Sequence, residues 1–529
     1  MSGPKALEVM EAPKKKPGQN KYAMACAILA SMTSTLLGYD VAVISGAASF
    51  IKEELHVSDT QLEILAGIIN LYALIGSFAA GRISDWIGRR YTIIMSTGIF
   101  FAGALIMGLA PSYAVLMVGR FVAGIGVGFA FMIAPVYTAE VAPTSIRGLL
   151  TSLAEVFING GILIGYIANF AFAGLPRHIG WRMMFCAGAV PPVFLALGVA
   201  TMPESPRWLV MQGRLGEAKR VLSKISDSPE EAELRLAEIK EAAGIPEDAN
   251  DDVVPVPKNR SHGEGVWRDM LLRPTPVLRR IVFCALGLQF FQQASGIDSV
   301  VLYGPRVFEK AGIKNNSHTL GATVAVGFSK TAFILVATFL LDRVGRRPLL
   351  LASGGGMIIS LLGLGLGLTV IDHHPGEKLT WAIVLSITTV LTFVGSFSIG
   401  LGPIAWVYCS EIFPLRFRAQ GNSLGTSMNR TMSGVISMTF LSLSKAITTG
   451  GAFFLYCGVA TAGWLFFYFF LPETRGKTLE EVELLFTKES DRVNQKHGQG
   501  PTAAASNGEV QLQNGAAGKH ISNGGEQNS

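Results

Sequence analysis

Six ionisable side chains lie within long apolar stretches of this 529-residue chain, where a charge is costly to bury. On insertion scales, a charged residue near the centre of a bilayer costs about 2.5–3.5 kcal/mol, so such residues commonly carry function. Half of the set is acidic and half is basic, so the fully ionised set would sum to zero. The six are Asp40, Arg120, Glu155, Asp298, Lys330 and Arg430.

A proton relay through these apolar stretches needs a side chain that titrates. Histidine is the usual choice near neutral pH, but all eight histidines lie outside the apolar stretches. The relay must therefore use a carboxylate. Asp40, in LLGYDVAVISG, lies in the middle of the stretch 22–50 and is the first candidate.

A pair of glutamines forms a second polar feature. Gln292 and Gln293 lie in an apolar stretch and precede Ser295-Gly296, where a helix can break. An amide both donates and accepts hydrogen bonds, and inside an apolar segment it needs partners.

The elements that position these residues are predicted to be membrane-spanning helices. Only 16% of the residues are charged, against about 25% in an average soluble domain. The mean hydropathy is +0.41, and apolar runs long enough to cross a bilayer recur along the chain. The sequence predicts an all-α membrane protein with twelve transmembrane helices. These are 22–49, 62–84, 92–110, 113–136, 150–173, 182–202, 280–309, 319–341, 349–371, 381–408, 419–446 and 451–471.

The predicted spans fall into two six-helix halves, 22–202 and 280–471, that flank a polar linker, 203–279. Within this linker, GRLGEAKRVLSKI and SPEEAELRLAEIKEAAG combine helical periodicity with mixed charge. We expect short amphipathic helices on the cytoplasmic membrane surface there. The remaining segments are an N-terminal tail, 1–21, and a C-terminal tail, 472–529, whose composition predicts disorder after about residue 490.

The basic residues indicate the orientation in the membrane. They cluster in the N-terminal tail and in the short loops after the second and eighth spans, as the positive-inside rule expects on the cytoplasmic side. Both termini are therefore predicted to be cytoplasmic. The same clustering argues against nucleic-acid binding, despite a net charge of +6.

The two halves carry paired motifs in the same order. GRISDWIGRR ends the second span and LLDRVGRRPLL the eighth; EVAPTSIRG follows the fourth and EIFPLRFRAQG the tenth. PESPRWL follows the sixth span and PETRGKTLEE the twelfth. This internal repeat predicts two parallel halves around a central cavity, an arrangement suited to alternating access.

From about residue 20 to about residue 480 the chain resembles the sugar porters of the major facilitator superfamily. The resemblance depends on GRISDWIGRR, RFVAGIGVG, PESPRWL, QQASGID, DRVGRRP, GPIAWVYCSEIFP and PETRGKTLEE. ILASMTSTLLGYD and APVYTAEVAP are most similar to plant polyol and monosaccharide transporters. The resemblance implies the major facilitator fold and proton-coupled symport of monosaccharides and of polyols such as sorbitol, mannitol or inositol.

The same resemblance implies a role for two of the buried charges. In proton-coupled members, an aspartate of the first span binds the proton and an arginine of the fourth span is its partner. Asp40 and Arg120 match these positions. Approach of the guanidinium would favour the ionised carboxylate, and its withdrawal would favour the protonated form. A static structural pair is the alternative.

Substrate contacts are implied for Gln292, Gln293, Trp406 and Asn429. The chain departs from its relatives at Glu155, Asp298 and Lys330, each of which stands where relatives carry an amide. We expect these three in the substrate site as well. We also expect an ion pair between Asp298 and Lys330 that lines the cavity, with a purely structural pair as the alternative.

Two of the charged residues each have more than one candidate role. Glu155 is also a candidate for a second protonatable group. Arg430 follows Asn429 and could either balance Glu155 or reach toward water in the cavity.

Charged residues of the paired motifs are expected to bridge neighbouring spans and to latch the cytoplasmic side when the carrier opens outward. The alternative is that they only determine topology. They are Asp85, Arg89, Arg90, Glu140, Arg147 and Glu204 in the first half and Asp342, Arg346, Arg347, Glu411, Arg418 and Glu473 in the second.

Two other functions compete with proton symport: facilitative uniport by the same fold, and sugar sensing with little transport. An enzyme is disfavoured because no nucleotide-binding loop, metal-ligand spacing or nucleophile–histidine arrangement appears. We expect no cofactor and a monomeric, multi-pass protein of the plasma membrane. Its expected partners are a polyol or monosaccharide, a proton and the lipid bilayer.

Overall fold

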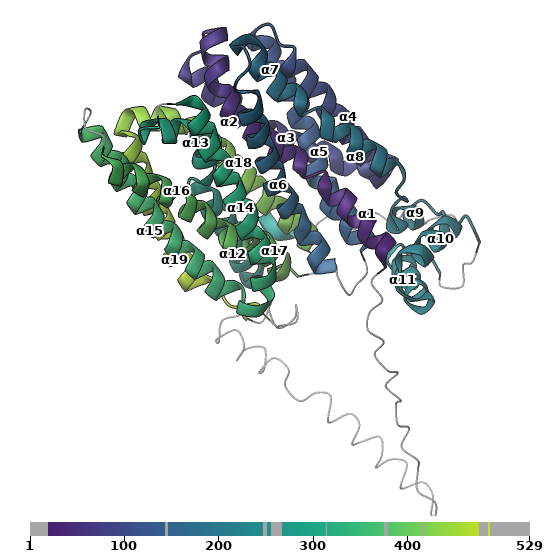
Figure 1. Cartoon of the computed structure of the whole chain (residues 1–529). Coiled ribbons are helices and arrows are strands. Elements are labelled where there is room, and N and C mark those ends of the chain that lie inside the picture. The colour runs from purple at the N-terminus through teal and green to yellow at the C-terminus, as the bar shows by residue number, and fades with distance from the viewer. Residues whose placement is uncertain are drawn as a thin grey trace, which may run out of the picture.

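The computed structural model describes residues 20–142, 147–246, 251–254, 267–313, 315–374, 379–414, 417–475 and 485–486. Its described elements are all helical. Figure 1 shows the N-terminal half, in purple and blue, beside the C-terminal half, in green and yellow. The twelve predicted membrane-spanning helices are confirmed, although several of them consist of two helices each.

The N-terminal half contains six spans built from eight helices. The first span consists of α1 and α2, separated by Thr33-Ser34, and the sixth of α7 and α8, separated by Gly188-Ala189. The helices are α1 (Lys21–Met32), α2 (Thr35–Leu55), α3 (Asp59–Ile87), α4 (Arg89–Gly108), α5 (Tyr113–Val141), α6 (Arg147–Phe172), α7 (Arg177–Ala187) and α8 (Val190–Ala200).

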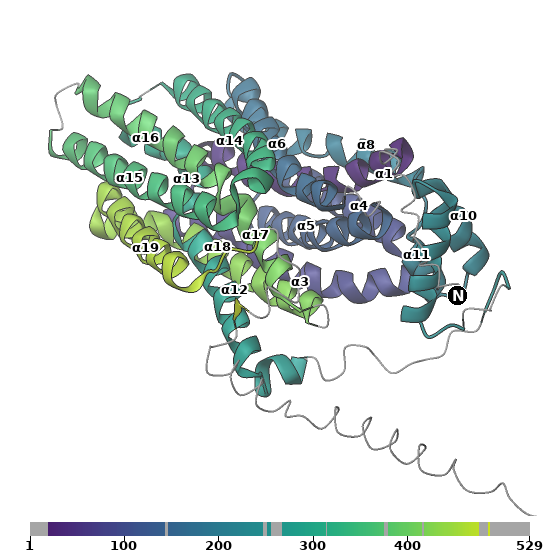
Figure 2. The same cartoon turned by 90° about the horizontal axis from the view of Figure 1, so that it is seen from below.

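Short helices follow the N-terminal half, and two of them lie where the periodicity of the polar linker predicts helices, at 213–225 and 228–244. They are α9 (Pro206–Met211), α10 (Leu215–Ile225), α11 (Pro229–Ala242) and the π-helix η1 (Arg268–Leu272). Ser205 and Ser228 cap α9 and α11 through their side-chain oxygens. Figures 1 and 2 place α9–α11 at one end of the N-terminal half, next to the start of α1.

The C-terminal half repeats the six-span plan. Its helices are α12 (Pro276–Ala294), α13 (Ile297–Lys310), α14 (Asn316–Val344), α15 (Arg346–His373), α16 (Thr380–Ile399), α17 (Leu401–Ile412), α18 (Arg418–Ile447) and α19 (Thr449–Phe470). In the part of the chain that is described, ten spans are long and apolar enough to cross a membrane by composition alone. The seventh span (α12 and α13) and the polar α18 complete the twelve.

The breaks in the seventh and tenth spans lie at glycines. Gly296 adopts a left-handed conformation, φ +84°, between α12 and α13, where Ser295-Gly296 predicts a break. A Cβ at Gly296 would lie 2.5 Å from the ring of Tyr456, so both conformation and space require glycine. In the tenth span α17 begins after Gly400, slightly before the Gly402-Pro403 step where the sequence predicts bending.

The two halves contact one another mainly along two antiparallel helix pairs. The first half of α3 packs against the last half of α18, where Gly67 approaches Met438. On the other side, α6 packs against α14, where Gly327 approaches Tyr166. The close contacts between the two halves therefore lie toward the end of the molecule where α3 begins.

Candidate functional site

A fully buried ion pair lies inside the N-terminal half. Arg120 of α5 and Asp40 of α2 each have an exposed fraction of 0%, and Arg120 Nη1 lies 2.5 Å from Asp40 Oδ2. Arg120 also donates to the α3 carbonyls of Leu65 (2.9 Å) and Ala66 (3.3 Å). The second oxygen of Asp40, Oδ1, is buried without a hydrogen-bond partner. One carboxylate oxygen of Asp40 is therefore bonded to Arg120, and the other has no hydrogen-bond partner.

The position of Asp40 depends on the close approach of α2 to α6. A Cβ at Gly38 would lie 1.9 Å from the carbonyl oxygen of Ile158, so only glycine fits there. Tyr39 fixes α2 from another side, because its hydroxyl donates to the carbonyl of Met184 at 2.6 Å. Packing on both sides of the chain therefore orients Asp40 toward α5.

Four amide side chains form a buried network between α12, α17 and α18. Asn429 Nδ2 donates to Gln292 Oε1 (2.5 Å) and to Gln289 Oε1 (2.9 Å), and Gln293 Nε2 donates to Asn429 Oδ1 (3.2 Å). Gln292 also donates to the carbonyls of Leu401 (3.1 Å) and Gly402 (2.9 Å). The structure thus brings together the predicted Gln292, Gln293 and Asn429, and it leaves Gln293 Oε1 buried and unpartnered.

Gln289 belongs to this network but was not predicted. It lies three and four residues before Gln292 and Gln293, in QFFQQ, and so shares their face of the helix. This spacing inside an apolar span is the signal that identifies it.

Aromatic side chains of both halves meet beside the amides. The half-buried Trp406 of α17 contacts Phe131 of α5 edge to face, with ring centroids 5.6 Å apart. The guanidinium of Arg430 lies 4.5 Å from the centroid of Phe131, and its Nη1 lies 3.5 Å from Asn70 Oδ1. Arg430 therefore forms no direct ion pair with Glu155, and its guanidinium lies against an aromatic ring of the opposite half.

The expected ion pair between Asp298 and Lys330 is not formed. Asp298 instead accepts a hydrogen bond from the Ser433 hydroxyl of α18, and Lys330 Nζ lies 5.9 Å from the ring centroid of Phe397. Ser433 was not predicted, and it supplies the carboxylate with a nearer donor than the lysine.

Glu155 lies in the first half of α6 and keeps part of its surface accessible. One turn later, the buried Asn159 donates to the Glu155 carbonyl at 2.8 Å, and Thr331 of α14 donates to the Asn159 carbonyl at 3.2 Å. The Asn159 side-chain oxygen is buried without a partner. Asn159 is thus a further polar residue at the boundary between the halves that was not predicted.

Comparison with known proteins decides the family. The model of the family "Sugar (and other) transporter" matches residues 26–486. Polyol transporter 5 of Arabidopsis thaliana is 64% identical over 475 residues, which cover 90% of this chain and 88% of that protein. The chain belongs to the sugar transporter family.

Solved structures agree with this family. The proton:xylose symporter XylE of the major facilitator superfamily, with 6-bromo-6-deoxy-D-glucose bound, has a TM-score of 0.71 at 27% identity, and the match covers 89% of this transporter and all of that chain. A partially occluded, inward-open conformation of XylE from E. coli has a TM-score of 0.72 at 26% identity and covers 87% and 100%. The fold is that of the major facilitator superfamily, and the protein is a transporter rather than an enzyme.

The paired motifs of the transporter form one charge cluster at the same end of each half. In the N-terminal half, Arg89 bonds to Glu140 (3.2 Å) and Asp85 (2.9 Å), and Glu204 accepts from the backbone N–H groups of Arg89 (2.9 Å) and Arg90 (3.1 Å). Burial raises the pKa of Glu204, and these backbone donors oppose that shift.

The cluster of the C-terminal half repeats this arrangement. Arg346 bonds to Glu411 at 2.9 Å, and Glu473 accepts from the N–H groups of Arg346 (3.0 Å) and Arg347 (2.9 Å). Arg418 is half-buried nearby, with two guanidinium nitrogens unpartnered. The side chains of Arg147 and Asp342, predicted for the same clusters, lie outside the described residues. Each of the ion pairs named for the two clusters stays within one half.

The opposite end of the transporter is bridged between the halves by charges that were not predicted. Asp59, at the start of α3, bonds to Lys445 (2.5 Å) and Arg306 (3.3 Å) of the C-terminal half and to Lys52 (2.6 Å) of its own half. One turn on, the buried Glu63 accepts from the backbone N–H (2.7 Å) and hydroxyl (2.5 Å) of Ser442. The described structure is therefore closed at the end where α3 begins.

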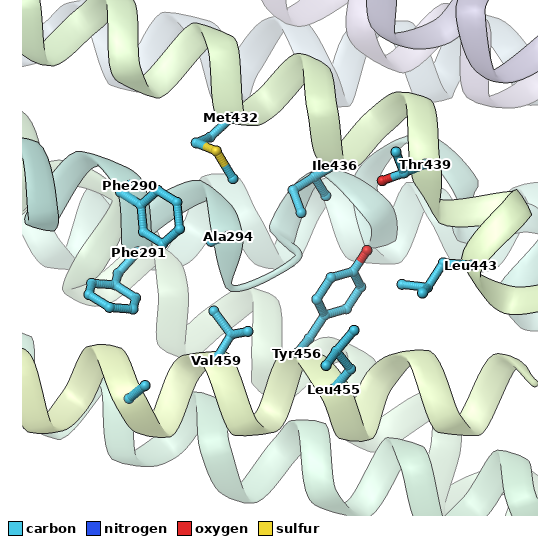
Figure 3. Close-up of a pocket in the computed structure, with 11 residues that line it drawn as sticks. Phe290, Phe291, Ala294, Met432, Ile436, Thr439, Leu443, Leu455, Tyr456 and Val459 are labelled. Atoms are coloured by element: carbon cyan, nitrogen blue, oxygen red, sulfur yellow. The ribbon is translucent and has the colours of Figure 1, made fainter. Parts of the chain in front are cut away.

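An apolar cavity of about 360 Å³ lies apart from these polar residues, between α12, α18 and α19. Figure 3 shows Phe290, Met432 and Ile436 around it, with Tyr456 near its edge. The Tyr456 hydroxyl lies 3.1 Å from Ser299 Oγ, just past the break at Gly296. Its lining offers few partners for hydroxyl groups, so this cavity is unsuited to a sugar or polyol.

Proposed function

We propose that the transporter carries polyols and monosaccharides together with protons, by alternating access, across the plasma membrane, with both termini in the cytoplasm. The names of its relatives support the substrate class: one is a polyol transporter and another a proton:xylose symporter. The observation that carries proton coupling is the fully buried Asp40–Arg120 pair, in which one carboxylate oxygen has no partner.

The pair can exchange a proton in a way that depends on its geometry. While Arg120 is bonded to Asp40, the ionised carboxylate is stabilised and the proton is absent. When Arg120 moves away, an ionised Asp40 would be left uncompensated in an apolar environment, so it takes up a proton at a carboxylate oxygen. The Leu65 and Ala66 carbonyls hold two other guanidinium nitrogens and can retain Arg120 after it leaves the aspartate.

The proposed substrate site lies between the amide network and the charged residues. Gln292, Gln293 and Asn429 supply donors and acceptors, and Trp406 supplies an apolar ring face for the C–H surface of the substrate. Glu155, Asp298 and Lys330 supply charge-assisted hydrogen bonds to hydroxyls. The burial of Gln292, Gln293, Lys330 and Asn429 inside apolar spans supports these assignments.

The closed end defines the state of the transport cycle. If the N-terminus is cytoplasmic, α3 begins on the outer side, and the Asp59 and Glu63 bridges close that side. The paired clusters at the inner side do not bridge the halves among the described residues. We therefore infer an inward-facing conformation in which the inner latch is disengaged.

The function is tested in proteoliposomes with a proton gradient, acidic outside. We expect the unmodified transporter to accumulate sorbitol against its gradient and to alkalinise the outer medium as it does so. The variant Asp40→Asn should keep counterflow of sorbitol but lose accumulation, because the asparagine cannot load and release a proton.

The exposed Glu53, bonded to Arg177 within the N-terminal half, provides the control Glu53→Gln, which should accumulate sorbitol normally. Undiminished accumulation by Asp40→Asn would refute proton coupling through Asp40. Sorbitol entry without any alkalinisation by the unmodified protein would instead support facilitative uniport.

A further inference from the structure

One aromatic ring of the N-terminal half lies between two side chains of the C-terminal half. Phe131 belongs to α5, whereas Trp406 belongs to α17 and Arg430 to α18. Trp406 meets the Phe131 ring edge to face, with the centroids 5.6 Å apart, and the guanidinium of Arg430 lies 4.5 Å from the same centroid. Two helices of the C-terminal half thus contact a single ring of the other half.

This contact lies beside the amide network, on the side toward the two paired charge clusters. We call that end of the molecule the cluster end. Trp406 lies about one turn beyond Gly402 on α17, and the Gly402 carbonyl accepts from Gln292 of the network. From there α17 continues to the C-terminal cluster, and α5 continues from Phe131 to Glu140 of the N-terminal cluster. Phe131 and Trp406 therefore join the halves next to the proposed substrate site.

The path between the two halves differs at its two ends. At the end where α3 begins, Asp59 and Glu63 bond to residues of the C-terminal half and close the path. At the cluster end, each ion pair named for the two clusters stays within one half. The route from the amide network to the cluster end therefore passes the contact between Phe131 and Trp406.

The guanidinium of Arg430 reaches out of its own half to make this contact. Its Nη1 lies 3.5 Å from Oδ1 of Asn70 on α3, and its Nε is buried without a hydrogen-bond partner among the described residues. A cation over an aromatic face is attracted by the ring, more strongly where water is excluded. Arg430 therefore holds the Phe131 ring close to α18 and beside Trp406.

We propose that Arg430 is a positioning residue that holds Phe131 against Trp406 as a gate, and that opening this gate sets how fast substrate enters and leaves at the cluster end. This inference deepens the proposed function and rests on it. A gate must open for passage in either direction, so it slows association and dissociation alike and leaves the affinity nearly unchanged. A residue that only binds the substrate would change mainly the dissociation rate.

The rates of sorbitol binding test the gate. Purified full-length transporter is mixed with sorbitol in a stopped-flow instrument, and tryptophan fluorescence, to which the half-buried Trp406 contributes, follows binding. The observed rate is plotted against sorbitol concentration: its slope gives the association rate constant and its intercept the dissociation rate constant. Xylose replaces sorbitol if the unmodified protein binds no sorbitol.

We expect Phe131→Leu and Arg430→Gln each to raise both rate constants about 10-fold, since a cation–π contact of ordinary strength is lost. The double variant should be no faster than Phe131→Leu alone, because Arg430 acts through the ring. Phe121→Leu is the matched control on α5: its exposed ring contacts Tyr72 of its own half, so neither rate constant should change.

Three results would overturn the proposal: unchanged rates in Phe131→Leu, a change confined to the dissociation rate, or additive effects of the two substitutions in the double variant. Failure of the proposed function is recognised separately, because the unmodified transporter would then not accumulate sorbitol in proteoliposomes. Each protein's unfolding temperature is measured first, and Phe131→Met or Arg430→Met replaces a variant that does not fold.

Discussion

At the scale of single residues, Asn429 holds the proposed substrate site together. Its amide group contacts three glutamines of α12 at once, so the orientation of each glutamine depends on it. Buried amides that lose a partner carry the cost of desolvation without compensation. The network is therefore expected to respond as a unit to the loss of one member.

We predict that Asn429→Ala raises the KM for sorbitol about 10-fold, because Gln289 and Gln292 lose a donor and reorient. The proton-to-sorbitol ratio should stay the same, since Asp40 and Arg120 are untouched. Transport kinetics in proteoliposomes measure both quantities. Ser427→Ala is the control: its hydroxyl bonds only to the carbonyl of Ser423 in the same helix. An unchanged KM in Asn429→Ala would remove this residue from the site.

Polar residue types in apolar spans, together with the resemblance to sugar porters, predicted several residues of this site, because buried polar groups are rare in such spans. Asp40, Arg120, Gln292, Gln293 and Asn429 are buried and hydrogen-bonded. What the sequence could not show is which donor lies nearest to a given acid. That depends on helix rotation, which is set by tertiary packing.

Asp298 and Glu63 are two acids whose contacts could not be read from the sequence. The sequence places Asp298 and Lys330 on neighbouring spans, but the structure has Ser433 as the hydrogen-bond partner of Asp298. Glu63 lies near the predicted end of a span, where charge is inexpensive, and only the docking of α18 buries it.

At the scale of helices, the contact of α2 with α6 determines where Asp40 lies. We predict that Gly38→Ala destabilises the transporter by about 1–3 kcal/mol, because the added methyl group overlaps the Ile158 carbonyl. Thermal unfolding followed by size-exclusion chromatography measures the effect. Gly160→Ala, on α6, meets open space and should leave the unfolding temperature unchanged or raise it. Equal stability of the two variants would contradict so close an approach of α2 to α6.

Hydropathy predicted the existence of the twelve spans better than their internal breaks. Apolar length is a property of composition, so spans appear directly in the sequence. The break at Gly296 has a local signal, because a left-handed residue favours glycine. The interruption of the first span at Thr33-Ser34 lacks such a signal, since Thr33 keeps a helical conformation and its hydroxyl bonds to the Ala30 carbonyl instead.

At the scale of the whole molecule, closure at one end depends on Asp59. Its carboxylate bonds to cations of both halves, so its loss leaves Lys445 and Arg306 without this partner. We predict that Asp59→Asn shifts the population toward the outward-facing state. Amide hydrogens in 59–70 and 434–445 should then exchange faster with deuterium, as followed by mass spectrometry. Glu53→Gln is the control, and equal exchange in both variants would show that Asp59 does not hold the closed state.

The same bridge links the transporter to the ionic composition of its surroundings. If the N-terminus is cytoplasmic, mobile ions in the outer medium reach the bond between Lys445 and Asp59, because the Lys445 side chain is 66% exposed. They cannot reach the Asp40–Arg120 pair, whose side chains are 0% exposed. Rising salinity should therefore change which way an empty carrier faces while leaving its stoichiometry intact. A cell in a saline environment would then see altered uptake without any change in the number of carriers.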